Sequence, residues 1–148
     1  MARHVLQLDH SLPGTLEPVY SSILDMRRFG QHHPYMKEVI LVNSTSEYNE
    51  YHVKEMVWIF GFIPQWHKYK TRVFEREKNR HIQYTSAVNG RVNLSIDFFF
   101  DENCRSTRIS ENVHLHGNGL VCRVLLNLIN RSHQALFKSI CNQHLAGN

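Results

Sequence analysis

The spacing of apolar residues in the first part of the chain predicts one strand followed by a helix. Residues 3–12 alternate in polarity, as a half-buried β-strand does, and Pro13-Gly14 interrupts that pattern. From residue 16 to residue 24 the apolar positions change to the i, i+3, i+4, i+7 spacing of an amphipathic helix. Thr15 stands directly before this helix, where a hydroxyl side chain can cap the first turn.

A second, shorter helix is expected directly after the first. Asp25 can cap a turn of helix over residues 26–29. Gly30 would end this turn in a left-handed conformation, which glycine adopts without steric cost. The chain would then enter a loop at His32-His33-Pro34.

Residues 37–116 have a period of two, which predicts six consecutive strands. Polar and glycine-containing turns separate these strands at residues 44–50, 61–64, 75–80, 89–90 and 101–106. Asn89-Gly90 is the clearest turn, because a two-residue hairpin of the primed type needs positive φ at both central positions. This turn is expected to join strands at residues 82–88 and 92–100.

Residues 119–145 are expected to form one long amphipathic helix, about 40 Å long at ~1.5 Å per residue. Its apolar side is formed by Leu120, Val121, Val124, Leu125, Leu128, Ile129, Ala135, Leu136 and Ile140. The whole chain is therefore predicted to be α+β, in the order β-α-α-β6-α. Consecutive hairpins make an antiparallel sheet with one buried face, and only the last helix is long enough to cover it. A seven-stranded sheet must curl around a straight helix, so we expect an apolar cavity between them.

The composition narrows the classes of protein to consider. With 148 residues the chain has the size of one domain, which we expect to span residues 1–148. The apolar run at residues 56–63 is far shorter than the roughly 20 residues that span a bilayer, and the first ten residues lack the apolar core of a secretion signal. We therefore expect a cytoplasmic protein whose three cysteines, Cys104, Cys122 and Cys141, are reduced and packed.

The net charge of +4 is dispersed along the chain. Its densest basic stretch, residues 68–72, alternates cations with uncharged residues, as one solvated strand face does, so we expect no nucleic-acid partner. His114 and His116 are the best-placed pair for a metal, but both are predicted on the wet side of their strand and no third ligand can be named. The chain has no phosphate-binding or dinucleotide fingerprint, and we expect neither a metal nor a cofactor.

The apolar parity of the strands predicts which side chains face the cavity. The inward rows are Val92, Leu94, Ile96, Phe98 and Phe100; Ile109, Glu111, Val113 and Leu115; Ile82, Tyr84, Ser86 and Val88; and His67, Tyr69, Thr71 and Val73. Glu111 stands in an apolar row, where a carboxylate is costly unless it is paired or protonated, so its pKa should rise. Glu111 would either hold a polar group of a ligand or be a structural carboxylate bonded to a neighbour. The inward hydroxyls can likewise orient a ligand or satisfy one another.

Two parities are open for residues 51–60. One places Tyr51, Val53, Glu55 and Val57 inside, and the other places Met56, Trp58 and Phe60 inside. We favour the first because it leaves Lys54 in water, and it makes Glu55 a second interior carboxylate.

The favoured parity leaves Trp58, Phe60, Phe62 and Trp66 clustered around the turn at residues 61–64. An aromatic patch at a hairpin tip is typical of a ligand gate, a homodimer contact or a loop that touches a membrane. The alternative is that the turn folds back under the first helices and is covered.

The order of elements is accompanied by a local resemblance to a known group of proteins. The first helix stripe ends in Asp25-Met26, and His33-Pro34 is followed by Met36-Lys37-Glu38-Val39. With the terminal helix, these features resemble the SRPBCC superfamily, whose helix-grip fold is shared by START lipid-transfer domains, birch-pollen-allergen-like proteins and bacterial polyketide cyclases. The resemblance implies a hydrophobic ligand pocket, and an enzymatic activity in only some members.

Two functions are compatible with this resemblance. The first is binding of a lipid- or polyketide-like small molecule, with Glu111, Tyr69 and Tyr84 holding its polar end. The expected ligand contacts are Tyr69, Thr71, Tyr84, Ser86, Ile96, Phe98, Glu111, Val113, Val124 and Leu128. The second is a cyclase- or dehydratase-like enzyme, in which Glu111 with Glu55 or His33 moves protons at a polyketide-like substrate.

Overall fold

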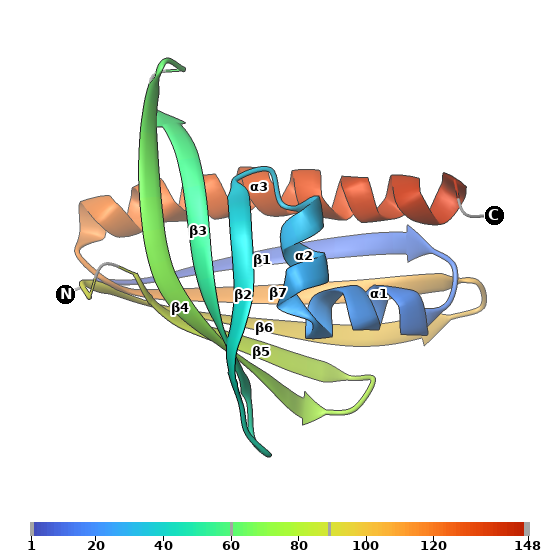
Figure 1. Ribbon diagram of the computed structural model, residues 1–148. Helices are drawn as coiled ribbons and strands as arrows, with labels where there is room; N and C mark the ends of the chain where they lie inside the picture. The colour runs from blue at the N-terminus through green and yellow to red at the C-terminus, as the bar shows by residue number, and fades with distance from the viewer. Residues whose placement is uncertain (1, 60, 89, 147–148) are drawn as a thin grey trace.

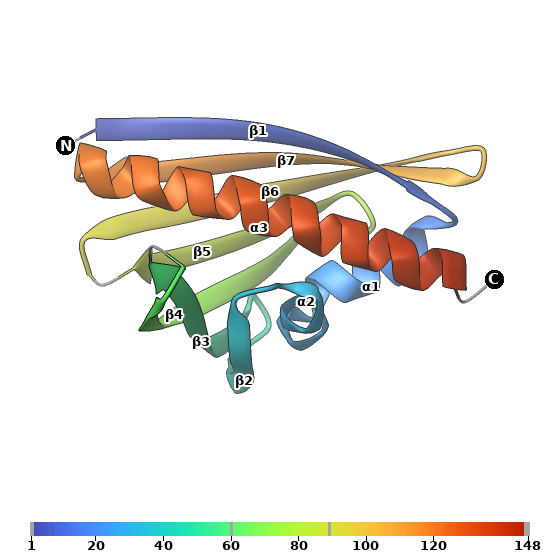
Figure 2. The ribbon, with the colours of Figure 1, turned by 90° about the horizontal axis from the view of Figure 1, so that it is seen from above.

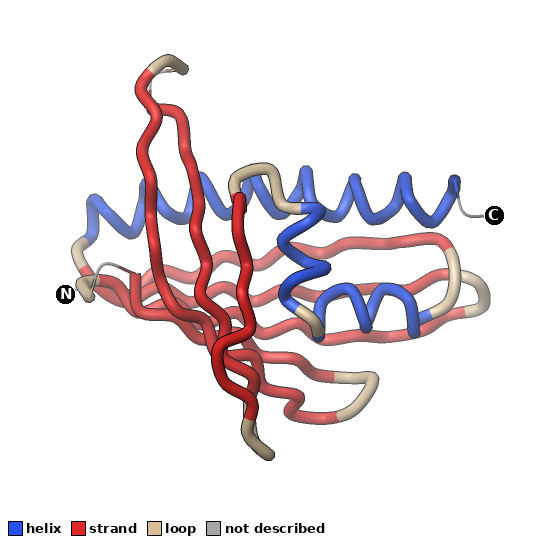
Figure 3. Tube along the Cα trace, viewed as in Figure 1, coloured by secondary structure: helices blue, strands red, loops and turns tan. Residues whose placement is uncertain are grey.

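The computed structural model describes residues 2–59, 61–88 and 90–146. Over these residues a strand, two short helices, six strands and a long helix follow one another, as the sequence predicts (Figures 1 and 3). The strands are β1 (Ala2–Pro13), β2 (Met36–Ser44), β3 (Asn49–Ile59), β4 (Ile63–Glu77), β5 (His81–Val88), β6 (Val92–Asn103) and β7 (Ser106–Gly117). The helices are α1 (Leu16–Leu24), α2 (Met26–His32) and α3 (Gly119–Ala146).

The strands form one antiparallel sheet in the order β1-β7-β6-β5-β4-β3-β2. β1 lies at one edge because it pairs with β7, the last strand in the chain. β4 pairs with β5 only from Thr71 to Glu77, whereas residues 63–70 pair with β3 alone. The hairpin of residues 54–70 therefore leaves the body of the sheet as an arm, which extends past α3 in Figure 1. We call this hairpin the β3–β4 arm.

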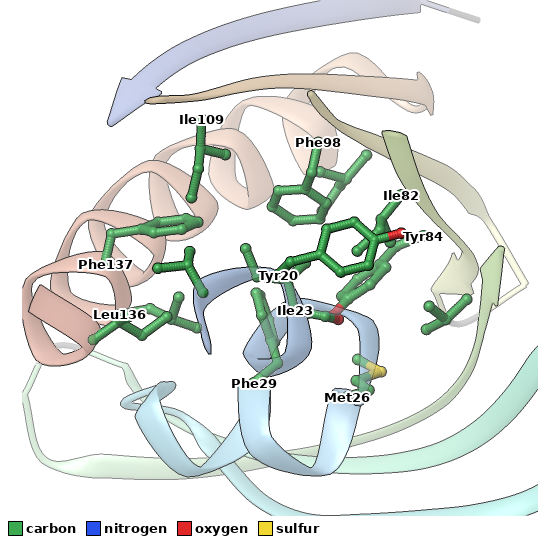
Figure 4. Close-up of a cluster of buried hydrophobic side chains, with 14 of the residues drawn as sticks. Tyr20, Ile23, Met26, Phe29, Ile82, Tyr84, Phe98, Ile109, Leu136 and Phe137 are labelled. Atoms are coloured by element: carbon green, nitrogen blue, oxygen red, sulfur yellow. The ribbon is translucent and has the colours of Figure 1, made fainter. Parts of the chain in front are cut away.

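α3 crosses the concave face of the curved sheet (Figure 2). Its second half packs into the main core, where Leu136 and Ile140 are fully buried. α1 and α2 close the same end, and Figure 4 shows Phe29, Phe98 and Phe137 gathered there from α2, β6 and α3. The expected helix-grip arrangement is thus confirmed, with its densest packing at one end of the helix.

The two short helices differ in detail from the prediction. Asp25 caps α2, since its side chain accepts a hydrogen bond from the backbone N–H of Arg27. Thr15 stands at the N-cap of α1, but its side chain makes no capping hydrogen bond. The prediction that Gly30 ends α2 in a left-handed conformation is wrong, because α2 continues to His32. A Cβ on Gly30 would lie 2.6 Å from Cγ2 of Val39, so this glycine lets α2 approach β2.

The predicted parities of the strands agree with the burial of their side chains. Tyr51, Val53 and Val57 are buried, whereas Trp58 is 52% exposed, which confirms the favoured parity of β3. The hairpin between β5 and β6 is also confirmed, and Gly90 has the expected positive φ. However, Val88 pairs with Val92, so three residues rather than two separate the paired ends. Asn89 lies outside the described residues.

The cysteines are free, but they do not share one role. Cys122 is buried in a small cluster with Val92 and Leu115 under the start of α3, as a packing role requires. Cys104 is exposed, so the predicted packing role is wrong for this residue, which follows the end of β6 in a surface turn. Within the described part of the chain, no helix is both long and apolar enough to cross a bilayer.

Candidate functional site

A cavity of about 1020 Å³ separates the first half of α3 from the sheet. Its walls come from α2, the β3–β4 arm, the inner faces of β5 and β6, and α3 itself. Much of the wall is apolar, and includes Met26, Phe29, Val57, Ile96 and Leu128. The cavity predicted from the mismatch between a straight helix and a curved sheet therefore exists, and it lies where the sheet diverges.

Most of the residues expected to contact a ligand are on the cavity wall. The wall contains Tyr69, Thr71, Tyr84, Ser86, Ile96, Val124 and Leu128, together with His33 and Glu55. Phe98, Glu111 and Val113 face inward as predicted but lie behind the wall, each with no exposed surface. Phe29 of α2 and Phe137 of α3 pack against Phe98, and His133 of α3 bonds to Glu111.

Glu111 is enclosed by two histidines that come from opposite parts of the chain. His133 of α3 donates through Nδ1 to Oε1 of Glu111, and His10 of β1 lies 3.1 Å from Oε2 through its Nε2. The His10 ring also stacks on Phe137, with 3.9 Å between the ring centroids. Both carboxylate oxygens therefore have protein partners, which favours the structural role for Glu111 over direct ligand contact.

The electrostatics of Glu111 follow from these partners. Burial alone would raise the pKa of Glu111, but the charge of His133 and the hydrogen bonds of His10 and His133 lower this pKa to about 2. The predicted rise in the pKa of Glu111 is therefore wrong. The carboxylate is ionised at neutral pH, and it holds the His133 ring at the cavity wall.

His33 is buried at the end of α2 and is held in one tautomer. Its Nδ1 accepts a hydrogen bond of 3.1 Å from the backbone N–H of Tyr35. Burial, together with the charge of His133, lowers the pKa of His33 to about 3, while the charge of Glu111 opposes this change. His33 is therefore neutral at pH 7, and the proton of its ring is on Nε2. Among the described residues Nε2 has no hydrogen-bond partner, so this nitrogen can donate to a group in the cavity.

Glu55 and Tyr69 form a second polar group on the wall. The hydroxyl of Tyr69 donates to Oε1 of Glu55 across 2.5 Å. Burial raises the pKa of Glu55, and the hydrogen bond from Tyr69 and the charges of His133 and His67 act in the opposite direction. His67 lies directly opposite Glu55 in the register of β3 and β4. A ligand that reaches this group meets an acceptor that already has one donor.

The other inward hydroxyls are satisfied within the protein. The Tyr84 hydroxyl donates to the backbone carbonyl of Ile23 in α1. The hydroxyls of Thr71 and Ser86 bond to each other across 2.7 Å, between β4 and β5. The sequence predicts that Tyr84 holds the polar end of a ligand. However, Tyr84 has no hydroxyl proton left to donate to a ligand, because its only one is already used in the bond to Ile23.

The inward row of β4 is confirmed at His67, which lines the cavity, but sequence reasoning missed other polar residues of the wall. These are Gln65, Asn127, Ser132 and His133. A signal for His133 was present, because it lies on the helical stripe formed by Ile129, Leu136 and Ile140. A histidine on an apolar stripe needs a buried partner, and Glu111 is that partner.

The aromatic turn of the β3–β4 arm is not covered by the first helices. Phe62 is 69% exposed and Trp66 is about half-exposed, while Trp58 also lines the cavity. The alternative in which the turn folds back under α1 and α2 is therefore wrong. Phe60, the fourth residue of the predicted cluster, lies outside the described residues.

His114 and His116 are exposed on the outer face of β7, as their parity predicts. No group of three His, Cys, Asp or Glu side chains in the described ranges is arranged to hold a metal ion. The polar groups of the cavity are therefore considered as hydrogen-bonding and proton-transfer groups.

No protein-family model and no curated protein matches this sequence. Solved structures match it over almost its full length. The TTHA0849 protein from Thermus thermophilus has a TM-score of 0.78 at 13% identity, over 98% of this chain and 99% of that one. The ZhuI aromatase/cyclase from Streptomyces sp. R1128 has a TM-score of 0.79 at 11% identity, over 96% and 93% of the two chains.

A START superfamily protein from Mycobacterium smegmatis also matches, with a TM-score of 0.68 at 14% identity over 95% of this chain and 96% of that one. Such low identities establish the architecture and leave the chemistry of the cavity to its own residues. The curved seven-stranded sheet, the long terminal helix and these neighbours together show that the chain has the helix-grip fold.

Proposed function

We propose that the protein binds a largely apolar small molecule, lipid- or polyketide-like, in the cavity between α3 and the sheet. The cavity is the observation that carries this proposal, since about 1020 Å³ is at the upper end of the range of small-molecule sites. Burial of apolar ligand surface against Phe29, Ile96 and Leu128 would supply most of the affinity.

The polar groups of the cavity indicate what kind of polar end the ligand has. His33 is a neutral donor through Nε2, and it is buried deep in the cavity beside His133, with 5.8 Å between the two ring centroids. A ligand oxygen that accepts hydrogen bonds, such as a ketone or a phenolate, fits this end. The apolar remainder of such a ligand would extend along α3 toward the β3–β4 arm.

This proposal is tested by filling the cavity. Leu128→Trp places an indole in the wall. Ala135→Trp adds the same group on the same helix at a position that is exposed, so the sequence prediction that placed Ala135 on the apolar side is wrong. Native mass spectrometry of protein purified gently from its host should show a retained small molecule in the parent chain and in Ala135→Trp. We expect Leu128→Trp to lose this mass. Retention of the same molecule by both variants, or none in the parent chain, would contradict the proposal.

A second candidate function is acid–base catalysis on a bound polyketide-like substrate. The observation in its favour is that His33, His133 and Glu55 reach one cavity, and that the Glu111 carboxylate orients His133 from behind. Glu111 then acts through His133 rather than on the substrate, which changes the role expected from the sequence.

The probe 5-nitrobenzisoxazole tests this second function without knowledge of the substrate. A base removes the proton on its carbon, the electron pair of that C–H bond forms a nitrile, and the N–O bond breaks to release a coloured phenolate. The quantity measured is the rate of phenolate release by the protein above the rate in buffer alone. We expect His133→Asn to lower this rate at least tenfold and His33→Asn to lower it less. A parent chain no faster than buffer, or an unchanged rate in His133→Asn, would exclude this function.

A further inference from the structure

The mouth of the cavity is surrounded by exposed apolar side chains. Trp58, Phe62, Ile63 and Trp66 of the β3–β4 arm and Leu120, Val121 and Val124 of α3 are each at least 40% exposed. They include most of the large apolar side chains that are exposed in the described part of the chain. Trp58 lines the cavity together with the three α3 residues, whereas Phe62, Ile63 and Trp66 lie at the end of the arm, beyond the cavity wall. We call these seven residues the mouth patch.

The segments that form this mouth contain one carboxylate, Glu55. Asp and Glu are absent from residues 56–74, 78–96 and 112–148, which include most of the β3–β4 arm, the turn between β5 and β6, and all of α3. Glu55 itself faces the inside of the cavity and is bonded to Tyr69. The surface around the mouth is therefore apolar and cationic, although the chain as a whole has 13 acidic residues.

Four cations border the mouth patch. Lys54 lies over the ring of Trp66, with 4.6 Å between Nζ and the ring centroid, and Lys68 is its direct partner in the β3–β4 register. Arg91 is on the cavity wall, and Arg123 is exposed in the first turns of α3. None of the four has an ion-pair partner among the described residues. These charges are available to an external anionic surface.

We propose that the mouth patch docks the protein on an anionic phospholipid bilayer, with the cavity opening toward the lipid. Tryptophan rings and aliphatic side chains partition into the interface of a bilayer, and each nearby Lys or Arg adds attraction to anionic headgroups. A second copy of this chain fits the same surface less well, because the cations beside each patch would face their own equivalents.

The arrangement of the elements supports docking at this edge. The β3–β4 turn extends past α3 in Figure 1, and Figure 2 shows this hairpin beside the first half of α3. The arm and the first half of α3 therefore border the same cavity. If the proposed function is correct, the ligand is an amphiphile that partitions into membranes and passes between the bilayer and the cavity. That last step rests on the proposed function, whereas the docking itself does not.

The fluorescence of the protein reports on the mouth patch directly. The chain has two tryptophans, Trp58 and Trp66, and both belong to the patch. We expect vesicles of phosphatidylcholine with 30% phosphatidylserine to shift the tryptophan emission of the protein to shorter wavelength. The protein should bind vesicles of phosphatidylcholine alone at least tenfold more weakly. No shift with either kind of vesicle would overturn the proposal.

Variants separate the contributions of charge, apolar surface and overall stability. Lys54→Glu/Lys68→Glu keeps both tryptophans and should weaken binding to the anionic vesicles at least tenfold. Phe62→Ser/Leu120→Ser should do the same, whereas Ile40→Ser/Val42→Ser, at exposed apolar positions of β2, should stay within twofold of the parent chain. An equal loss in the β2 variant would contradict the proposal.

Two further measurements identify a competing occupant and separate docking from ligand binding. The competing outcome is a dimer of the parent chain in native mass spectrometry that Phe62→Ser/Leu120→Ser converts to monomer. If the parent chain also fails to bind vesicles, the patch belongs to a second copy, and bilayer docking is overturned. Leu128→Trp should lose the cavity ligand but keep vesicle binding. If it keeps both, the proposed function fails and docking stands.

Discussion

The two halves of α3 belong to the same amphipathic helix but face very different surroundings. Leu136 and Ile140, in the second half, are fully buried, whereas Leu120 is 74% exposed and Val124 is 54% exposed. α2 packs beside the second half, through Phe29 against His133 and His32 against Ser139, whereas the first half contacts the sheet through the small cluster around Cys122. An apolar stripe therefore predicts a helix face, but the elements that approach this face decide whether it becomes core or cavity wall.

The sheet shows the same contrast. Under the second half of α3, Phe98 packs against Phe29 and Phe137, whereas under the first half the β3–β4 arm diverges from β5. We expect substitutions at the closed end, formed by α1, α2 and the second half of α3, to reduce stability. Substitutions at the open end should mainly affect binding.

Removal of the buried carboxylate tests the closed end most severely. Glu111→Ala leaves His10 and His133 buried without their partner, and the loss of one member of a buried pair costs about 3–5 kcal/mol. Urea unfolding measures this loss. Glu55→Gln is the matched change on the cavity wall, where the Tyr69 hydroxyl can still donate to the amide oxygen, and it should cost about 1 kcal/mol or less. Similar losses of unfolding free energy in the two variants would contradict the expected difference between the closed end and the cavity wall.

Truncation of one leucine in each half of α3 compares the two ends directly. Leu136→Ala creates a cavity in the core and should lower the free energy of unfolding by about 2–5 kcal/mol. Leu120→Ala removes exposed surface and should change it by about 0.5 kcal/mol or less. Thermal or urea denaturation of both variants decides this, and a large loss in Leu120→Ala would mean that the mouth is packed in solution.

Acidification should lower the stability of the protein through His33, the neutral histidine at the boundary between the closed and open ends. The pKa of His33 is lowered from 6.5 to about 3 in the folded protein, so between these values the unfolded chain binds one more proton. Stability should therefore fall as the pH drops below about 6.5, by up to ~1.4 kcal/mol per pH unit. Below its ordinary pKa of 4.5, Glu111 adds to this loss, because its folded pKa is about 2.

His33→Asn should remove the part of this loss that lies between about pH 6.5 and 4.5, as measured by urea unfolding at several pH values. His114→Asn, at an exposed position on β7, is the control and should keep the slope of the parent chain. If the slope is unchanged in His33→Asn, another group causes the acid sensitivity.

The smallest effect is expected where α2 touches β2. Gly30→Ala should cost about 1 kcal/mol net, because the new Cβ would lie 2.6 Å from Val39 Cγ2 and this clash exceeds the gain in helix propensity. In a Val39→Ala background the clash is relieved, so Gly30→Ala should become neutral or stabilising by up to ~1 kcal/mol. Calorimetry of the four chains measures this coupling, and additive effects would show that close packing of α2 on β2 is unimportant.

Part of the candidate site could be predicted from the sequence, because a period of two specifies which side of a strand is buried. This rule placed Tyr69, Ile96 and Glu55 inside, and all three are on the cavity wall. The same rule could not distinguish Phe98 from Ile96, although Phe98 lies behind the cavity wall and Ile96 lines the cavity. That difference depends on which side chains of α2 and α3 lie above each residue.

The environment of Glu111 shows where local patterns fail. Its inward position was predicted, but the direction of its pKa shift was not, because His10 and His133 are 101 and 22 residues away from it. Such partners depend on the pairing of β1 with β7 and on the path of α3 across the sheet. A pKa is set by charges within a few ångströms, and sequence separation does not report such distances.

Hydrophobic periodicity and turn residues alone thus determined the order of the elements, the inward face of each strand and the need for one long covering helix, since these properties are local and repeat along the chain. Only the tertiary structure decided where the sheet diverges from the helix, which polar groups meet at Glu111 and His33, and which apolar residues are left exposed at the mouth. Those features arise from contacts between distant segments, whose geometry depends on the packing of the whole fold.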